Sequence, residues 1–123
     1  MKHSEGFLRL VDDAKSRIRE VTVAETQARL KQNPPAKLID VREDNEFAAA
    51  HAAGATHLGR GIIERDIETE VPDKTSELIL YCGGGYRSAL VADSLQKMGY
   101  TNVWSMAGGW RAWNEAGGEI TKE

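Results

Sequence analysis

The chain has 123 residues, of which 41% are hydrophobic and 28% are charged, and its formal net charge is −3. This length suits one domain with a single core, and the small negative charge without a Lys/Arg cluster argues against a nucleic-acid surface. No apolar run reaches the length of a membrane helix, and the single cysteine excludes an internal disulfide, so we expect a protein of the reducing cytoplasm.

Strand-like and helix-like patterns alternate along the chain. Helices are predicted where apolar residues recur at spacings of three and four, and strands where short apolar runs end at turn residues. In chain order we expect a helix over 5–18, a strand over 18–21, a helix over 22–31, a strand over 37–41, a helix over 44–50, a strand over 56–58, a helix over 62–70, a strand over 78–81, a helix over 86–98, a strand over 101–106 and a helix over 110–117. The alternation predicts an α/β fold, with a parallel sheet of about five strands and helices on both faces.

Several helix starts carry capping signals. Ser4 can cap the first helix, and Thr22 with Glu25 has the form of a capping box before the second. Asp44 is expected to cap the short helix that follows the strand over 37–41. Each of these oxygens would accept from N–H groups that have no partner inside the helix.

The chain divides into a main domain and two short flanks. We assign residues 1–17 to an N-terminal helical extension and 18–118 to the domain itself. The remaining residues, 119–123, form a polar tail that we expect to be frayed. Within the domain, residues 51–55 read as a loop.

The clearest chemical signal lies where the strand over 78–81 ends. Cys82 follows it directly, and three glycines separate this cysteine from the next helix. A helix start carries unpaired N–H groups and partial positive charge, and glycines let such groups turn inward around an anion. Arg87 adds a full charge, so the hollow favours the thiolate, which is the nucleophilic form of cysteine. The residues expected to line it are Gly83, Gly84, Gly85, Tyr86, Arg87 and Ser88.

Two further polar residues are candidates for supporting roles. Asp40 ends the strand over 37–41, and the carboxyl ends of parallel strands form the edge where α/β proteins bind ligands. Asp40 can also have a purely structural role, accepting backbone hydrogen bonds in the next loop, and this is the role we favour. Arg60 lies between two glycines and can face either the hollow or solvent.

No metal site or cofactor is predicted. A structural or catalytic metal needs three or four donors, and the chain has one cysteine and three histidines. His51 and His57 lack the spacing that would place two ligands on one helix face. We therefore expect structural or solvent-facing roles for both.

Three stretches in order resemble the single-domain rhodanese-like sulfurtransferases. Residues 38–55 are similar to the family's Asp-Val-Arg segment and the His…Gly-Ala turn after it. Residues 81–88 resemble the active-site loop, and residues 108–117 resemble the closing Gly-Gly…Trp…Gly element. Together they cover roughly 18–118 and imply a rhodanese-like fold.

The resemblance implies an enzyme that works through a persulfide. Cys82 would take the outer sulfur of thiosulfate or of a persulfide and pass it to cyanide or a thiol, with loop N–H groups stabilising the leaving anion. Asp40 and Arg42 match the family's strand-end pair, for which a structural role near the site is expected. The implied partners are a small sulfur donor and acceptor, or a protein in either role, without nucleic acid or membrane.

One departure bears on the donor. Many thiosulfate-using members carry a basic residue directly after the cysteine, where this chain has Gly83. The missing charge predicts weak binding of a dianion, which favours an organic persulfide or a protein as donor.

Two other functions stay open. The chain can be a sulfur-carrying or partner-binding module with little turnover of its own. A cysteine phosphatase or arsenate reductase also uses a cysteine, a loop and an arginine around an anion. The spacing from Cys82 to Arg87 is Cys-x4-Arg, one residue shorter than the Cys-x5-Arg of cysteine phosphatases. The tighter loop favours a single sulfur atom over a tetrahedral phosphate.

Overall fold

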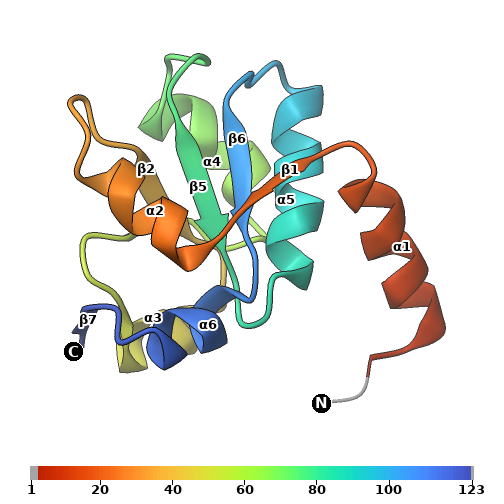
Figure 1. Ribbon diagram of the computed structural model, residues 1–123. Helices are drawn as coiled ribbons and strands as arrows, with labels where there is room; N and C mark the ends of the chain where they lie inside the picture. The colour runs from red at the N-terminus through yellow and green to blue at the C-terminus, as the bar shows by residue number, and fades with distance from the viewer. Residues whose placement is uncertain (1–2, 123) are drawn as a thin grey trace.

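Figure 1 shows the computed structural model of the chain, in which residues 3–122 are described. The predicted α/β fold is confirmed, because a five-stranded sheet with only parallel pairs has the strand order β1-β6-β5-β2-β4. Its strands are β1 (Arg19–Val21), β2 (Lys37–Asp40), β4 (Thr56–His57), β5 (Leu78–Tyr81) and β6 (Val103–Met106). The strand that leads to Cys82 is therefore the central one.

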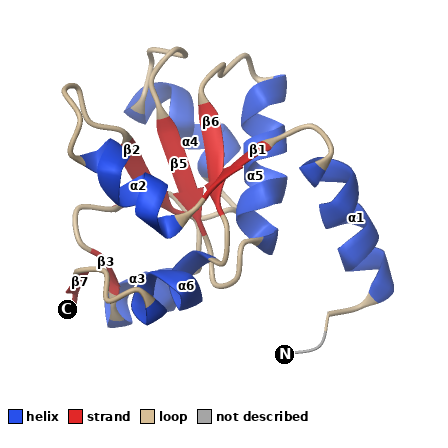
Figure 2. Ribbon diagram, in the orientation of Figure 1, coloured by secondary structure: helices blue, strands red, loops and turns tan. Residues whose placement is uncertain are grey.

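Residues 3–122 form six helices. Figure 2 shows how they are arranged around the sheet, with α1 on the outside of α5. The capping predictions at Ser4 and Thr22 are confirmed, because their hydroxyl oxygens accept from the N–H groups of Phe7 and Glu25 at 3.4 and 3.1 Å. The Glu25 carboxylate returns a bond to the Thr22 N–H at 2.8 Å. The helices are α1 (Glu5–Lys15), α2 (Val23–Leu30), α3 (Asp44–Ala49), α4 (Ile63–Glu70), α5 (Tyr86–Lys97) and α6 (Gly109–Glu115).

The central strand β5 is buried on both faces. Leu78 and Leu80 pack with the apolar residues of α4 and α5, whereas Ile79 and Tyr81 pack with those of α2 and α6. This alternation is the period-two geometry of a strand covered on both sides. Cys82 continues it on the α4–α5 side, so its side chain is directed by the same pleat.

Two local predictions are wrong. The helix α3 is capped by Glu43, whose N–H donates to the Glu46 carboxylate at 3.1 Å, and Asp44 is its first helical residue. The predictions of a loop over 51–55 and of a frayed tail over 119–123 are also wrong in part. In the structure β3 (His51–Ala52) pairs antiparallel with β7 (Ile120–Thr121). The sequence does not predict this pairing, because a strand of two residues is too short to show an alternating pattern.

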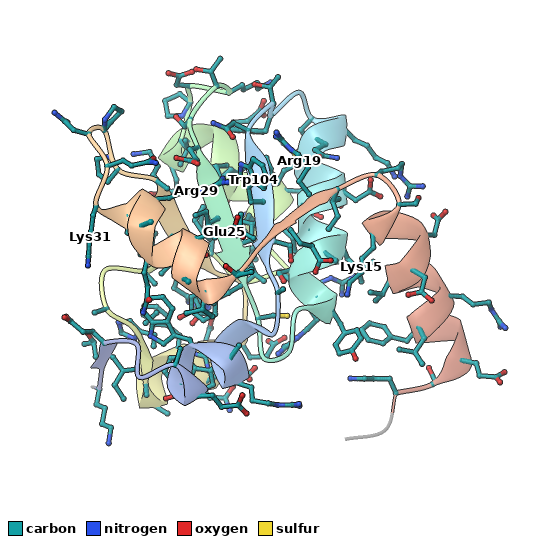
Figure 3. The ribbon with its side chains drawn as sticks, viewed as in Figure 1. Lys15, Arg19, Glu25, Arg29, Lys31 and Trp104 are labelled. Carbon is teal, nitrogen blue, oxygen red and sulfur yellow. The ribbon has the colours of Figure 1, made fainter. Side chains whose placement is uncertain are left out.

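Trp104 lies beside the edge strand between two cationic side chains. The guanidinium carbons of Arg19 and Arg29 stand 4.1 and 4.2 Å from its ring centroid, and Figure 3 shows the three side chains together. Contacts of this kind stabilise by electrostatic attraction to the ring face. The indole therefore packs within the fold instead of offering an open stacking surface.

The helix α1 packs against α5 rather than against the sheet (Figure 1). Its buried residues Val11 and Ala14 contact Ala89 and Leu90 of α5. A further link follows the helix, where the Arg17 guanidinium donates to both carboxylate oxygens of Asp93 at 2.9 and 2.8 Å. Near the start of α1, Phe7 packs in the same cluster as Tyr86, the first residue of α5, where the cysteine loop ends.

We expect the Arg17–Asp93 link to weaken at low pH. The hydrogen bond from Arg17, and then that from Lys97, holds the pKa of Asp93 below its ordinary value. A carboxylate whose pKa is lower in the folded state stabilises that state above the unfolded pKa of about 3.9, and this contribution disappears as the pH falls through the folded value. At neutral pH, Asp93→Asn should lower the free energy of unfolding by about 1 kcal/mol, because Arg17 is partly exposed.

Urea unfolding of both proteins between neutral pH and strongly acidic pH tests this expectation. The difference in unfolding free energy between the wild type and Asp93→Asn should shrink as the pH falls below about 4. Asp12→Asn removes an exposed carboxylate of α1 and should give no such difference at any pH. A wild-type advantage over Asp93→Asn that stays constant across the whole range would contradict the assignment.

Candidate active site

Cys82 lies at the carboxyl end of β5 and is buried, with 1% of its surface exposed. Its sulfur accepts hydrogen bonds from the backbone N–H groups of Gly85 and Ser88, at 3.2 and 3.4 Å. Both donors lie at the start of α5, where the helix supplies unpaired N–H groups. Of the residues expected to line the hollow, Gly85 and Ser88 are those whose N–H groups reach the sulfur, in an arrangement that favours negative charge there.

A buried pair of hydroxyls extends this cradle. The Ser88 oxygen stands 3.6 Å from the Cys82 sulfur and 2.8 Å from the Ser105 oxygen of β6. Both serines are fully buried. When the sulfur is a thiolate, Ser88 can donate to it while accepting from Ser105.

The start of α6 clamps the cysteine loop from the other side. The N–H groups of Trp110 and Arg111 donate to the carbonyl oxygens of Cys82 and Gly83 at 2.7 and 3.1 Å. Gly109 has φ +52°, and a side chain there would collide with the Cys82 carbonyl oxygen. The Gly-Gly turn is thus required by a close approach of two backbones.

Arg87 contacts two carboxylates at the edge of the loop. Its Nη1 lies 3.4 Å from an oxygen of Glu46 and 4.0 Å from one of Glu43. The charge predicted to complete the anion hollow is therefore shared with α3. This arrangement ties α3 to the cysteine loop and leaves Arg87 only part of its charge for a ligand.

Asp40 and Arg42 form a buried network at the end of β2, the strand that pairs with β5. Arg42 donates to both Asp40 oxygens, including a contact of 2.8 Å from Nη2, and also to the Ala50 carbonyl at 2.7 Å. The Tyr81 hydroxyl donates to Asp40 at 2.6 Å and accepts from the Ala52 N–H. Burial, and then the hydrogen bond to Asp40, holds the pKa of Tyr81 well above its ordinary value, so the phenol stays protonated.

A pocket of about 710 Å³ opens in front of Cys82. Arg60, which the sequence left as a candidate, is exposed and does not line this pocket, and neither do Asp40 and Arg42. The lining residues are His3, Ser4, Phe7, Glu46, Cys82, Gly83, Gly84, Tyr86, Arg87 and Arg111.

The sequence did not point to Arg111, or to the three lining residues of the N-terminal region, His3, Ser4 and Phe7, as part of the site. Their place depends on how α1 and α6 pack around the loop, which no local pattern records. One signal was available for Arg111, since it follows Gly108-Gly109, the element already matched to the family. Within residues 3–122 no group of three potential ligands is placed to hold a metal ion, and no helix is long and apolar enough to cross a membrane.

A family model described as "Rhodanese-like domain" matches residues 22–116, the part that holds the whole cysteine loop and its α6 clamp. The chain belongs to this family. Among rhodanese-like relatives, the protein YqhL of Bacillus subtilis is 36% identical over 88 residues, which are 69% of this chain and 64% of that protein. The thiosulfate sulfurtransferase GlpE of Haemophilus influenzae is 34% identical over 99 residues, covering 80% of this chain and 90% of that enzyme.

A solved structure also resembles this rhodanese-like chain over nearly its full length. The Rhodopseudomonas palustris protein RPA3614 superposes with a TM-score of 0.81 at 29% identity and covers 98% of both chains. It is described as a protein of unknown function and a "possible tyrosine phosphatase". The coverage extends beyond the family model and includes the region of α1.

Proposed function

We propose that the chain is a sulfurtransferase that carries a sulfane sulfur on Cys82. The observation that carries this proposal is the pair of N–H groups from Gly85 and Ser88 on the buried sulfur. Preorganised donors at this position stabilise the thiolate before transfer and the anionic persulfide after it. The sulfurtransferase name of a relative at 34% identity supports the same reaction class. The free thiol suits a reducing cytoplasm.

The reaction consists of two displacements at sulfur. The Cys82 thiolate attacks the outer sulfur of a donor R–S–SH, so that an S–S bond to Cys82 forms while the donor's S–S bond breaks and R–S⁻ leaves with the electron pair. With thiosulfate as donor, sulfite leaves in the same way. Cyanide or a thiolate then attacks the outer sulfur of the Cys82 persulfide and regenerates the Cys82 thiolate.

A phosphatase reaction is the second candidate, because the description of RPA3614 mentions it. The geometry favours sulfur transfer. The loop between Cys82 and Arg87 has only four residues, and Arg87 already contacts Glu46, so little charge is left for a phosphate dianion. Hydrolysis of p-nitrophenyl phosphate should therefore stay at the level of Cys82→Ser.

Intact mass measurement tests the main proposal. Purified protein is treated separately with thiosulfate, glutathione persulfide and inorganic polysulfide, then with cyanide. We expect a gain of one sulfur atom from at least one donor, reversed by cyanide with release of thiocyanate, and no gain in Cys82→Ser. A gain that persists in Cys82→Ser, or no gain from any of the three donors, would overturn the proposal. A sulfur carrier without turnover would take up one sulfur atom on Cys82 but would not transfer sulfur repeatedly when donor and acceptor are both in excess.

A further inference from the structure

The pocket in front of Cys82 is much larger than the cysteine loop needs for an inorganic anion. Its volume of about 710 Å³ lies within the range of roughly 300–1,000 Å³ typical of sites for organic ligands. Part of its wall comes from α1, which lies outside the residues that the family model matches. A donor the size of thiosulfate would leave most of this space to water.

Three rings form one wall of the pocket. His3 and Phe7 stand with ring centroids 4.6 and 6.3 Å from that of Tyr86, the first residue of α5. The centroids of His3 and Phe7 are 5.2 Å apart, so the rings make one continuous surface. The rings of Phe7 and Tyr86 contribute little to the binding of a small dianion but favour contact with carbon atoms.

The lining of the same pocket also includes an available positive charge. Arg87 is engaged by Glu46, whereas Arg111 has no carboxylate of residues 3–122 within 4.0 Å of its side-chain nitrogens. The backbone N–H of Arg111 donates to the Gly83 carbonyl, which fixes the residue's backbone beside the cysteine loop, and Arg111 lines the same pocket as Cys82. A guanidinium in this situation is well suited to bind a carboxylate through two N–H donors.

We propose that the ring wall and Arg111 form a subsite for the leaving half of an organic persulfide that carries a carboxylate. This inference rests on the proposed sulfurtransferase function and names its donor class. The carbon part contacts Phe7 and Tyr86, the carboxylate pairs with Arg111, and the outer sulfur meets the Cys82 thiolate. Bond formation between the two sulfurs releases the carboxylate-bearing thiolate R–S⁻ with the electron pair, without any other reactant.

The subsite also explains how the chain can do without a basic residue next to its cysteine. Gly83 leaves the pocket mouth open, and the positive charge comes from α6 instead of from the loop. The link between Arg17 and Asp93 holds α1, and with it the ring wall, against α5. Arg111, Phe7 and Tyr86 therefore act on donor selection and not on the displacement itself.

The test combines variants with matched donors. The rate of Cys82 persulfide formation is measured with glutathione persulfide, with the carboxylate-free persulfide of 2-mercaptoethanol, and with thiosulfate. Arg111→Gln removes a charged hydrogen-bond partner of the donor. Its kcat/KM for glutathione persulfide should therefore fall about tenfold, mainly because KM rises. The loss should be much smaller with the mercaptoethanol persulfide. Arg9→Gln removes an exposed arginine of α1 outside the pocket and should match the wild type.

The ring wall is tested with Phe7→Ala, which should raise KM for both organic persulfides more than for thiosulfate. The inference is overturned if wild type loads from thiosulfate or inorganic polysulfide at least as efficiently as from glutathione persulfide. It is also overturned if Arg111→Gln slows both organic donors equally. Loading of Cys82 by the inorganic donors alone would leave the sulfurtransferase function standing, whereas failure with every donor would remove both.

Discussion

Gly109→Ala should lower the free energy of unfolding by about 3 kcal/mol, which combines a strained positive φ with an overpacked contact. The added methyl group would meet the carbonyl group of Cys82 and the carbonyl carbon of Gly83, both backbone atoms that no rotamer change can move. Relief requires α6 to shift away from the cysteine loop. The hydrogen bonds from Trp110 and Arg111 to that loop would then lengthen or break.

The matched control is Gly117→Ala. Gly117 also has a positive φ, +72°, but a side chain there would meet nothing within 4 Å. It should cost only the backbone strain, about 1 kcal/mol, and leave sulfur loading intact. Thermal and urea unfolding, together with the mass assay for the Cys82 persulfide, separate the two variants. Equal destabilisation, or normal loading in Gly109→Ala, would show that the close approach of α6 does not shape the loop.

Arg42→Met should be the second large effect, with a loss of about 3–5 kcal/mol in unfolding free energy. Arg42 is 4% exposed and Asp40 is fully buried, so the substitution leaves a buried carboxylate without its charge partner. The Ala50 carbonyl also loses its donor. Because neither residue lines the pocket, we expect the loss in stability to exceed any loss of donor affinity.

A second substitution makes this expectation sharper. Asp40→Asn combined with Arg42→Met removes the orphaned charge and should recover part of the lost stability, since the penalty comes mainly from the unpaired ion. Arg65→Met breaks the exposed pair with Asp66 and should change stability by less than about 1 kcal/mol. Urea unfolding of five proteins gives the comparison: the wild type, Arg42→Met, Asp40→Asn, the double variant and the Arg65→Met control. Strict additivity of the two substitutions would contradict the role assigned to the network.

The sequence was most informative where local chemistry determines local structure. The strand that ends at Cys82, the glycines after it and the capping box at Thr22 each depend on neighbouring residues, and all appear as predicted. The order of the elements came from the spacing of apolar residues and from the turn residues between them. The parallel sheet with helices on both faces then follows from the alternation of strands and helices.

Apart from the one-residue shift of the α3 cap, the errors share a physical cause, which is dependence on tertiary contacts. The two-residue strand Ile120–Thr121 exists because it meets His51–Ala52, and neither segment shows a strand pattern alone. Arg60 was a candidate because glycines flank it, but the packing of α6 brings Arg111 to the pocket instead. Contacts between segments that lie far apart in the sequence produce no periodic pattern of apolar residues.

The burial of the Cys82 sulfur also determines which oxidation products the thiol can form in air. A disulfide between two copies would need their sulfur atoms to approach to about 2.05 Å, which a residue with 1% exposure at the base of a pocket does not permit. Small oxidants such as peroxide can still enter a pocket of about 710 Å³. Oxidative loss of this chain should therefore run through sulfenic acid on individual molecules, not through covalent dimers.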